Sequence, residues 1–175
     1  GIPQRGGMTW VIGKGGKPPL DPVQRFHAGR QLAAAKAHLL PLLNHSPADA
    51  ATRIYAACAA AESPLRGAEG RAGLPELTKA LSRVISRRAR KSVQELAPRV
   101  LTPERSVEAY CRAARRTTLR AGVLIAGDLH GALTVILGGH VSLEHLRASE
   151  DAMDLVGFHL SPVSLALRRE LGLAS

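Results

Sequence analysis

The chain has 175 residues, which is enough for one folded domain with its own hydrophobic core. Apolar residues make up 45% of it, which excludes a disordered chain. Aromatic residues make up only 3%, so a core of Ala, Leu and Val between packed helices is favoured over a β-sandwich. No apolar run is long enough to span a membrane, and the first residues lack the apolar centre of a signal peptide. We therefore expect a cytoplasmic protein without a membrane partner.

The net charge of +10 is concentrated in one segment. Residues 79–120 hold 12 Lys/Arg against 3 Asp/Glu, whereas residues 121–175 hold 3 against 6. Such a concentration of cations is typical of a surface for an acidic partner, nucleic acid included, although a charge run can also be a solvated helix face.

The chain order predicts an extended N-terminal segment over residues 1–19, with a short edge strand at Met8–Gly13, and a helical domain over residues 20–175. An internal loop at 63–73 contains three glycines. We predict a mainly α fold, a single domain of about six to eight helices. The expected helices are 20–44, 47–62, 74–96, 102–126, 129–137, 142–148, 150–159 and 162–170.

Cap residues followed by proline predict several helix starts, at Asp21-Pro22, Ser46-Pro47 and Ser161-Pro162. Pro98 is expected to end the third helix. Apolar residues at helical spacing predict two buried stripes. The first stripe is Phe26, Ala33, Ala37 and Leu40, and the second is Val107, Tyr110, Ala114, Thr117, Ala121 and Leu124. On the predicted helix 102–126, which carries the second stripe, Arg112, Arg116 and Arg120 are expected to face outward.

The segment Gly127-Asp128-Leu129-His130-Gly131 resembles the first metal-binding motif of calcineurin-like metallophosphoesterases. The further Asp, Asn and His ligands of that family are missing downstream, so an N-cap role for Asp128 is favoured. His27 and His38 lie about 16 Å apart along a straight helix, too far to share a metal. Cys58 and Cys111 are expected to be buried free thiols. The sequence therefore predicts no catalytic residues, no metal site and no cofactor.

The segment Pro19-Leu20-Asp21-Pro22, the following helix with Gly29–Ala34 and the later stretch Arg115–Leu137 resemble the layout of HtpX-like zinc metallopeptidases. In that family an HExxH helix supplies two histidine ligands and a glutamate base, and an ExxxD helix supplies the third ligand. The stretch AGDLHGAL at 126–133 also resembles the continuation of the second motif.

The resemblance implies a degenerate peptidase, because each motif position is changed. Arg30 and Ala34 stand at the histidine positions and Gln31 stands at the base. Arg115 and Leu119 stand at the Glu and Asp of the second motif. Gln cannot accept a proton from water, and Arg repels a metal cation. The chain also resembles the C-terminal regions of large bacterial tetratricopeptide-repeat proteins that carry such degenerate domains.

Two functions of different classes follow. The first is a non-catalytic interaction module of a larger protein, binding another protein, a peptide or another part of its parent chain in a cleft formed by Arg30, Gln31 and Arg115. The alternative is a nucleic-acid-binding helical domain that uses the basic face of residues 79–120. Its candidate residues are Arg83, Arg87, Arg88, Arg90, Lys91, Arg112 and Arg116.

Overall fold

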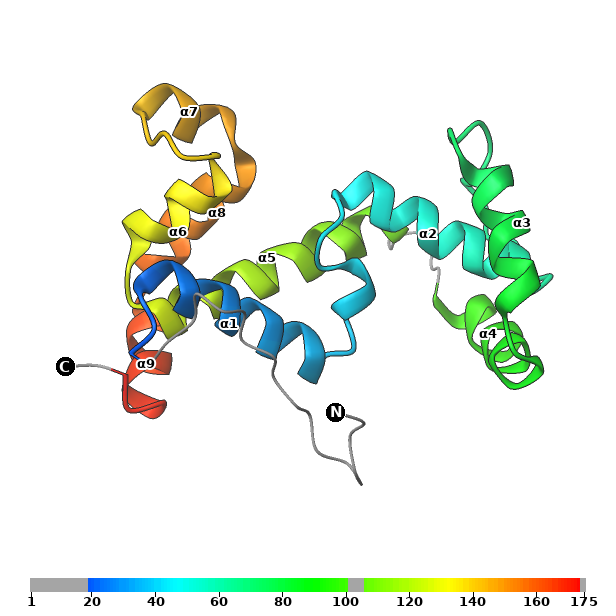
Figure 1. Cartoon of the computed structure of the whole chain (residues 1–175), viewed down its shortest axis with the longest axis horizontal. Helices are drawn as coiled ribbons and strands as arrows, with labels where there is room; N and C mark the ends of the chain where they lie inside the picture. Colours follow the sequence, from blue (N-terminus) through cyan, green and yellow to red (C-terminus); the bar gives the residue numbers. More distant parts are fainter. Residues whose placement is uncertain (1–18, 101–105, 174–175) are drawn as a thin grey trace. The chain divides into compact units, whose positions relative to one another are not determined.

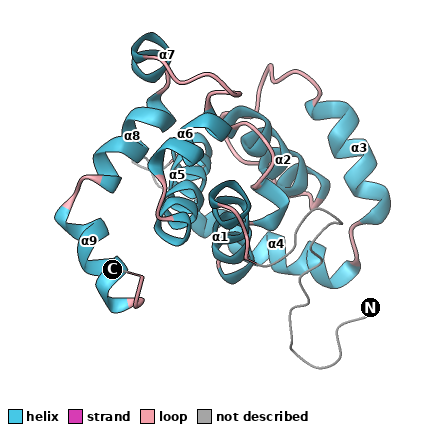
Figure 2. Ribbon diagram, turned by 60° about the vertical axis from the view of Figure 1, so that its left-hand side comes forward, coloured by secondary structure: helices cyan, strands magenta, loops and turns pink. Residues whose placement is uncertain are grey.

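The structure is a computed structural model that describes residues 19–100 and 106–173, and these residues form helices and loops without a strand (Figures 1 and 2). The mainly α prediction is confirmed. The predicted edge strand Met8–Gly13 and the predicted start of a helix at Thr102 lie outside the described residues. In chain order the helices are α1 Pro22–Lys36, the 3₁₀ helix η1 Leu40–Leu42, α2 Pro47–Ala60, α3 Leu74–Val84, α4 Arg87–Val100, α5 Val107–Ala126, α6 Leu129–Ile136, α7 Leu143–Ala148, α8 Glu150–His159 and α9 Pro162–Glu170.

The contacts within the chain group into two compact units, where the sequence predicted a single domain. Unit 1 comprises Gly1–Arg30 and Arg120–Ser175, and unit 2 comprises Gln31–Leu119. The divisions fall inside α1 and inside α5, so each of these helices contributes residues to both units.

Side-chain caps begin many of the helices, as their sequences predicted. At the start of α1, Asp21 Oδ1 accepts from the Gln24 backbone N–H at 2.8 Å, and the Asp21 N–H donates to Gln24 Oε1 at 3.2 Å. These reciprocal bonds form a capping box. Asp128 Oδ1 likewise accepts from the His130 N–H at 3.0 Å, which confirms Asp128 as the N-cap of α6. Serine caps α2, α7, α8 and α9 in the same way.

The predicted helix 20–44 was wrong in its length. The helix α1 ends at Lys36, His38 has a left-handed φ of 58°, and the chain continues as the 3₁₀ helix Leu40–Leu42. Pro41 has no backbone N–H to donate to an α-helical ladder, which explains why a long helix cannot continue here. The buried residues of α1 are therefore Phe26, Gly29 and Ala34, whereas the predicted positions Ala37 and Leu40 are exposed.

The predicted helix 74–96 is two helices. Ile85 has an extended backbone (φ −66°, ψ 122°) that ends α3, and Ser86 Oγ accepts from the Ala89 N–H at 3.1 Å to begin α4. The expected stop at Pro98 was also wrong, because α4 continues to Val100. Pro98 has no backbone N–H, so the last turn of α4 lacks the bond to the carbonyl of Gln94.

The core of unit 1 depends on two glycines that let α1 and α5 approach closely. A Cβ at Gly122 would lie 2.7 Å from Phe26 Cδ2 and 2.7 Å from Arg30 Cγ, and a Cβ at Gly29 would lie 2.9 Å from Ile125 Cβ. Phe26 is fully buried against this crossing. The small residues therefore create the space that the one large aromatic ring of α1 fills.

The predicted stripe of α5 was only partly right. Val107, Ala114 and Leu124 are buried, but Tyr110 is 54% exposed and Thr117 is also exposed. The buried positions are instead Val107, Cys111, Ala114, Thr118, Leu119, Gly122, Val123, Leu124 and Ala126. In the second half of α5 the buried positions lie around most of the helix circumference. A search for an apolar stripe on one side of the helix therefore does not identify all of them.

Arg120 was expected to face outward; its side chain is 44% exposed, and it also joins α5 to α8 within unit 1. Its Nη2 and Nε donate to the two oxygens of Asp154 at 2.6 and 3.0 Å, and its guanidinium lies 5.3 Å from the centre of the Phe158 ring. The bond to Asp154 raises the pKa of Arg120 above its ordinary value. Arg120 is thus a structural cation.

Gly122→Ala is expected to destabilise the protein by about 1–3 kcal/mol, because the added methyl group must displace Phe26 or Arg30. The matched control is Gly157→Ala in α8, where an added Cβ meets no atom within 4 Å and alanine is the better helix former. Thermal unfolding followed by circular dichroism compares the two. A Gly122→Ala melting temperature at or above that of Gly157→Ala would contradict the close crossing.

Candidate functional site

Within unit 2, the helix α4 is held through one face against the C-terminal end of α2. Gln94 Nε2 donates to the Ala61 carbonyl at 2.8 Å, and Arg90 pairs with the Glu62 carboxylate. Ala97, one turn further along the same face, is only 3% exposed. Positions 90, 94 and 97 follow the spacing of a single helix face. This face is therefore the docking face of α4.

The C-terminal end of α2 suits a cationic partner. Its last carbonyls carry the partial negative charge of the helix dipole, so a guanidinium nearby is favourable. Glu62 just beyond the helix has a left-handed φ of 61°, an uncommon conformation for a residue with a side chain. From this position its carboxylate forms an ion pair with Arg90. Arg90 is therefore paired with a carboxylate of the same chain, although the sequence placed it among the nucleic-acid-binding candidates.

A neighbouring face of α4, whose centre lies about 110° around the helix axis from the docking face, presents cations to solvent. At 100° per residue, Arg87, Lys91, Arg88 and Arg99 fall within an arc of about 120°. All four are exposed. Glu95, the one acidic residue in the α4 sequence, falls on the same arc and is also exposed. We call these four basic residues the cationic face of α4.

Arg99 was missing from the sequence-based set because the helix was expected to end at Pro98. Its distance from Arg88 is eleven residues, which returns to nearly the same side of a helix. The helical spacing of the charged residues Arg88, Lys91, Glu95 and Arg99 was the sequence signal that could have placed Arg99 on this face. It required the helix to run through the proline, as the structure shows it does.

The other predicted basic residues are distributed over α3 and α5. Arg83 is exposed in the last turn of α3, and Arg112 is exposed on α5. Arg116 is half-buried, with its Nε enclosed by protein. On α3, Glu76 and Lys79 share the exposed side with Arg83, so that side carries mixed charge. The densest group of exposed cations is therefore on α4.

The predicted cleft residues have different surroundings. The Arg30 guanidinium lies 5.7 Å from the centre of the Phe26 ring in unit 1, and Gln31 is exposed. Arg115 lines a pocket of unit 2, and neither Arg30 nor Gln31 is among the residues that form that pocket. A shared ligand site of the three residues stays a prediction.

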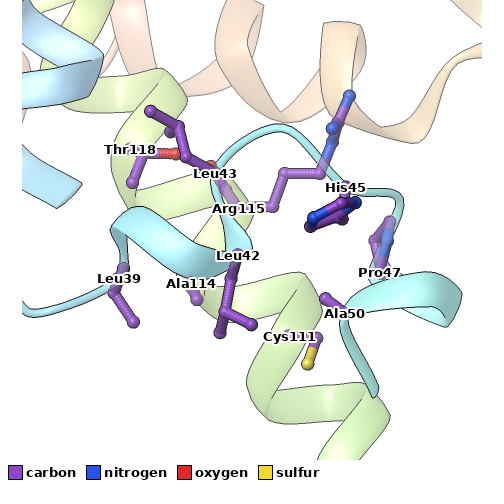
Figure 3. A pocket seen from close by; sticks show the side chains of 10 residues that line it. All are labelled: Leu39, Leu42, Leu43, His45, Pro47, Ala50, Cys111, Ala114, Arg115 and Thr118. Atoms are coloured by element: carbon purple, nitrogen blue, oxygen red, sulfur yellow. The ribbon is translucent and has the colours of Figure 1, made fainter. Parts of the chain in front are cut away.

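The pocket beside Arg115 is small and mainly apolar (Figure 3). It lies between α5, the 3₁₀ helix and the start of α2, and its cavity volume of about 10 Å³ holds roughly one water molecule. A carboxylate or a peptide terminus needs more room than this. Its lining residues are Leu39, Leu42, Leu43, His45, Pro47, Ala50, Cys111, Ala114, Arg115 and Thr118.

A second cation of unit 2 is also used internally. Arg71, in the loop before α3, pairs with Glu108 and lies 4.4 Å from the centre of the Tyr55 ring. These contacts hold the loop over a core cluster of Ala50, Ala51, Tyr55, Val107 and Cys111. The pairing also neutralises Glu108, one of the three acidic residues in the basic segment.

The thiols and histidines of the described residues are candidate nucleophiles and metal ligands. Cys58 and Cys111 are buried and unbonded, and burial raises the pKa of both thiols, so they are poor nucleophiles. Burial, followed by the nearby Arg30, lowers the pKa of His27. Among residues 19–100 and 106–173, no three His, Cys, Asp or Glu side chains are grouped to hold a metal ion.

Comparison of the chain with protein-family models, with curated proteins and with solved structures found no match. In the part of the chain that the structure describes, every helix is too short or too polar to cross a membrane. The candidate site consequently rests on the geometry of α4 itself.

Gln94→Met is expected to destabilise unit 2 by about 1 kcal/mol, because the Ala61 carbonyl loses its donor while side-chain length is kept. Gln31→Met makes the same chemical change at an exposed position of α1 and is expected to stay within about 0.5 kcal/mol of the unchanged protein. Urea unfolding measures both. Equal midpoints for the two variants would show that the bond to Ala61 does not hold α4.

Proposed function

We propose that the chain is a non-catalytic binding module whose cationic face on α4 binds the phosphate backbone of nucleic acid. The observation that carries the proposal is the division of α4 into a docking face, which uses Arg90 and Gln94, and a neighbouring solvent-exposed face with four cations. A helix fixed on one side can offer its charges to a polyanion without first being ordered by the partner.

The mode of binding follows from the residues available. The sequences of α3 and α4 contain no aromatic residue on which a base could stack. Arg and Lys on a rigid helix instead contact phosphates, which are the same at every base pair. We therefore propose recognition of a nucleic-acid backbone with little dependence on base sequence. A cytoplasmic location, expected from the sequence, is compatible with such a partner.

The interaction-module reading, with its cleft of Arg30, Gln31 and Arg115, belongs to the same class of non-catalytic proteins. One observation favours a binding role for Arg115, which lines a pocket beside His45. The space for about one water molecule limits what that pocket can take. The α4 surface is the stronger proposal. The degenerate zinc-peptidase origin stays a hypothesis.

Salt dependence tests the proposal first. If all four cations contact phosphates of a duplex, the logarithm of the association constant falls with the logarithm of salt concentration at a slope of about −3.6. Affinity then decreases about a hundredfold between 50 and 200 mM salt. Fluorescence anisotropy with labelled duplexes of unrelated sequence measures the slope. The proposal would be overturned if no binding is seen at 50 mM salt, or if the affinity does not change with salt concentration.

Single charge changes on α4 locate the contact. Arg88→Gln and Arg99→Gln are each expected to weaken binding and to reduce the slope by about 0.9, because each removes one phosphate contact. Glu95→Gln removes a negative charge from the same face and is expected to tighten binding severalfold. Arg25→Gln, an exposed residue of α1 in unit 1, makes the same charge change elsewhere and should leave affinity nearly unaltered.

Anionic vesicles provide the competing outcome. Val84 is 75% exposed and Leu96 is 55% exposed, and a basic helix with exposed apolar residues can also lie on an acidic membrane surface. Vesicles containing phosphatidylserine are therefore tested with the same variants. Binding to vesicles without binding to duplex would reject nucleic acid as the partner.

A further inference from the structure

Two histidine rings lie side by side in unit 1, apart from the residues used above. His140 is in the loop between α6 and α7, and His145 is in the first turn of α7. Their ring centres are 5.6 Å apart, their planes are inclined by 85°, and both residues are exposed. The Ser142 side chain accepts from the His145 backbone N–H at 3.2 Å and thereby fixes the start of α7.

The separation of the rings suits a shared metal ion. Zinc binds imidazole nitrogen at about 2.0–2.1 Å, which places the ion about 3 Å from each ring centre. Two imidazoles on one tetrahedral ion consequently have centres about 5–6 Å apart. The observed 5.6 Å falls in this range. Both side chains are exposed, so they can reorient toward a shared ion.

One chain supplies too few ligands for a closed zinc site. Zinc in structural sites takes four protein ligands, and within the described residues no third His, Cys, Asp or Glu joins the pair to make a metal-binding group. We propose that His140 and His145 form half of a zinc site, and that a second copy of this chain supplies the other two imidazoles. A two-fold axis through the ion then relates the copies.

The number of ligands supports a second copy as their source. Each copy of the chain carries the same pair of imidazoles, so two copies supply the four ligands of a closed tetrahedral site.

The test is sedimentation of the untagged full-length chain with and without zinc chloride. We expect zinc to convert the chain to a dimer that holds one ion per two chains, and chelation by EDTA to reverse the change. His140→Ala and His145→Ala should each abolish the zinc-dependent dimer and weaken zinc binding at least about tenfold. The control His130→Ala removes another exposed histidine of unit 1 and should behave as the unchanged chain.

Three outcomes would overturn the inference. These are the absence of zinc binding at micromolar concentration, one zinc ion bound per chain without a change in mass, and a zinc-dependent dimer that persists in both His140→Ala and His145→Ala. Circular dichroism of the variants shows that they remain folded. Because the pair belongs to unit 1 and α4 belongs to unit 2, this result is independent of nucleic-acid binding by α4.

Discussion

The contact between α4 and the C-terminal end of α2 decides which side of α4 faces solvent. Gln94 satisfies the Ala61 carbonyl, Arg90 pairs with Glu62, and Ala97 is buried along the same line. Because Arg90 pairs with Glu62 on the docking face, the remaining four cations of α4 lie together on the neighbouring solvent-exposed face.

The boundaries of many elements could be predicted because the signals are local. A serine or aspartate followed by a helical stretch caps a helix through bonds made within three residues, as Ser46 and Asp128 do. The break after Lys36 has a local signal in Pro41, which the predicted helix 20–44 did not take into account. The break at Ile85 is an extended backbone conformation at a residue whose type does not predict it.

The candidate site was predictable as a segment and not as a set of residues. Charge counting identified residues 79–120, but charge alone does not distinguish a solvated arginine from a paired one. Arg90 forms an ion pair with Glu62, and Arg120 forms one with Asp154. Both carboxylates are far away in the sequence, so only the tertiary structure reveals these pairs. Arg99 was missed because the predicted helix, 74–96, ended before it.

The measurement that tests the account most directly is amide hydrogen exchange of the full-length chain with and without a saturating duplex oligonucleotide at low salt. We predict added protection over 87–99 of α4, and no change over 143–170. Protection confined to other helices would contradict the account, even if the chain bound the duplex tightly.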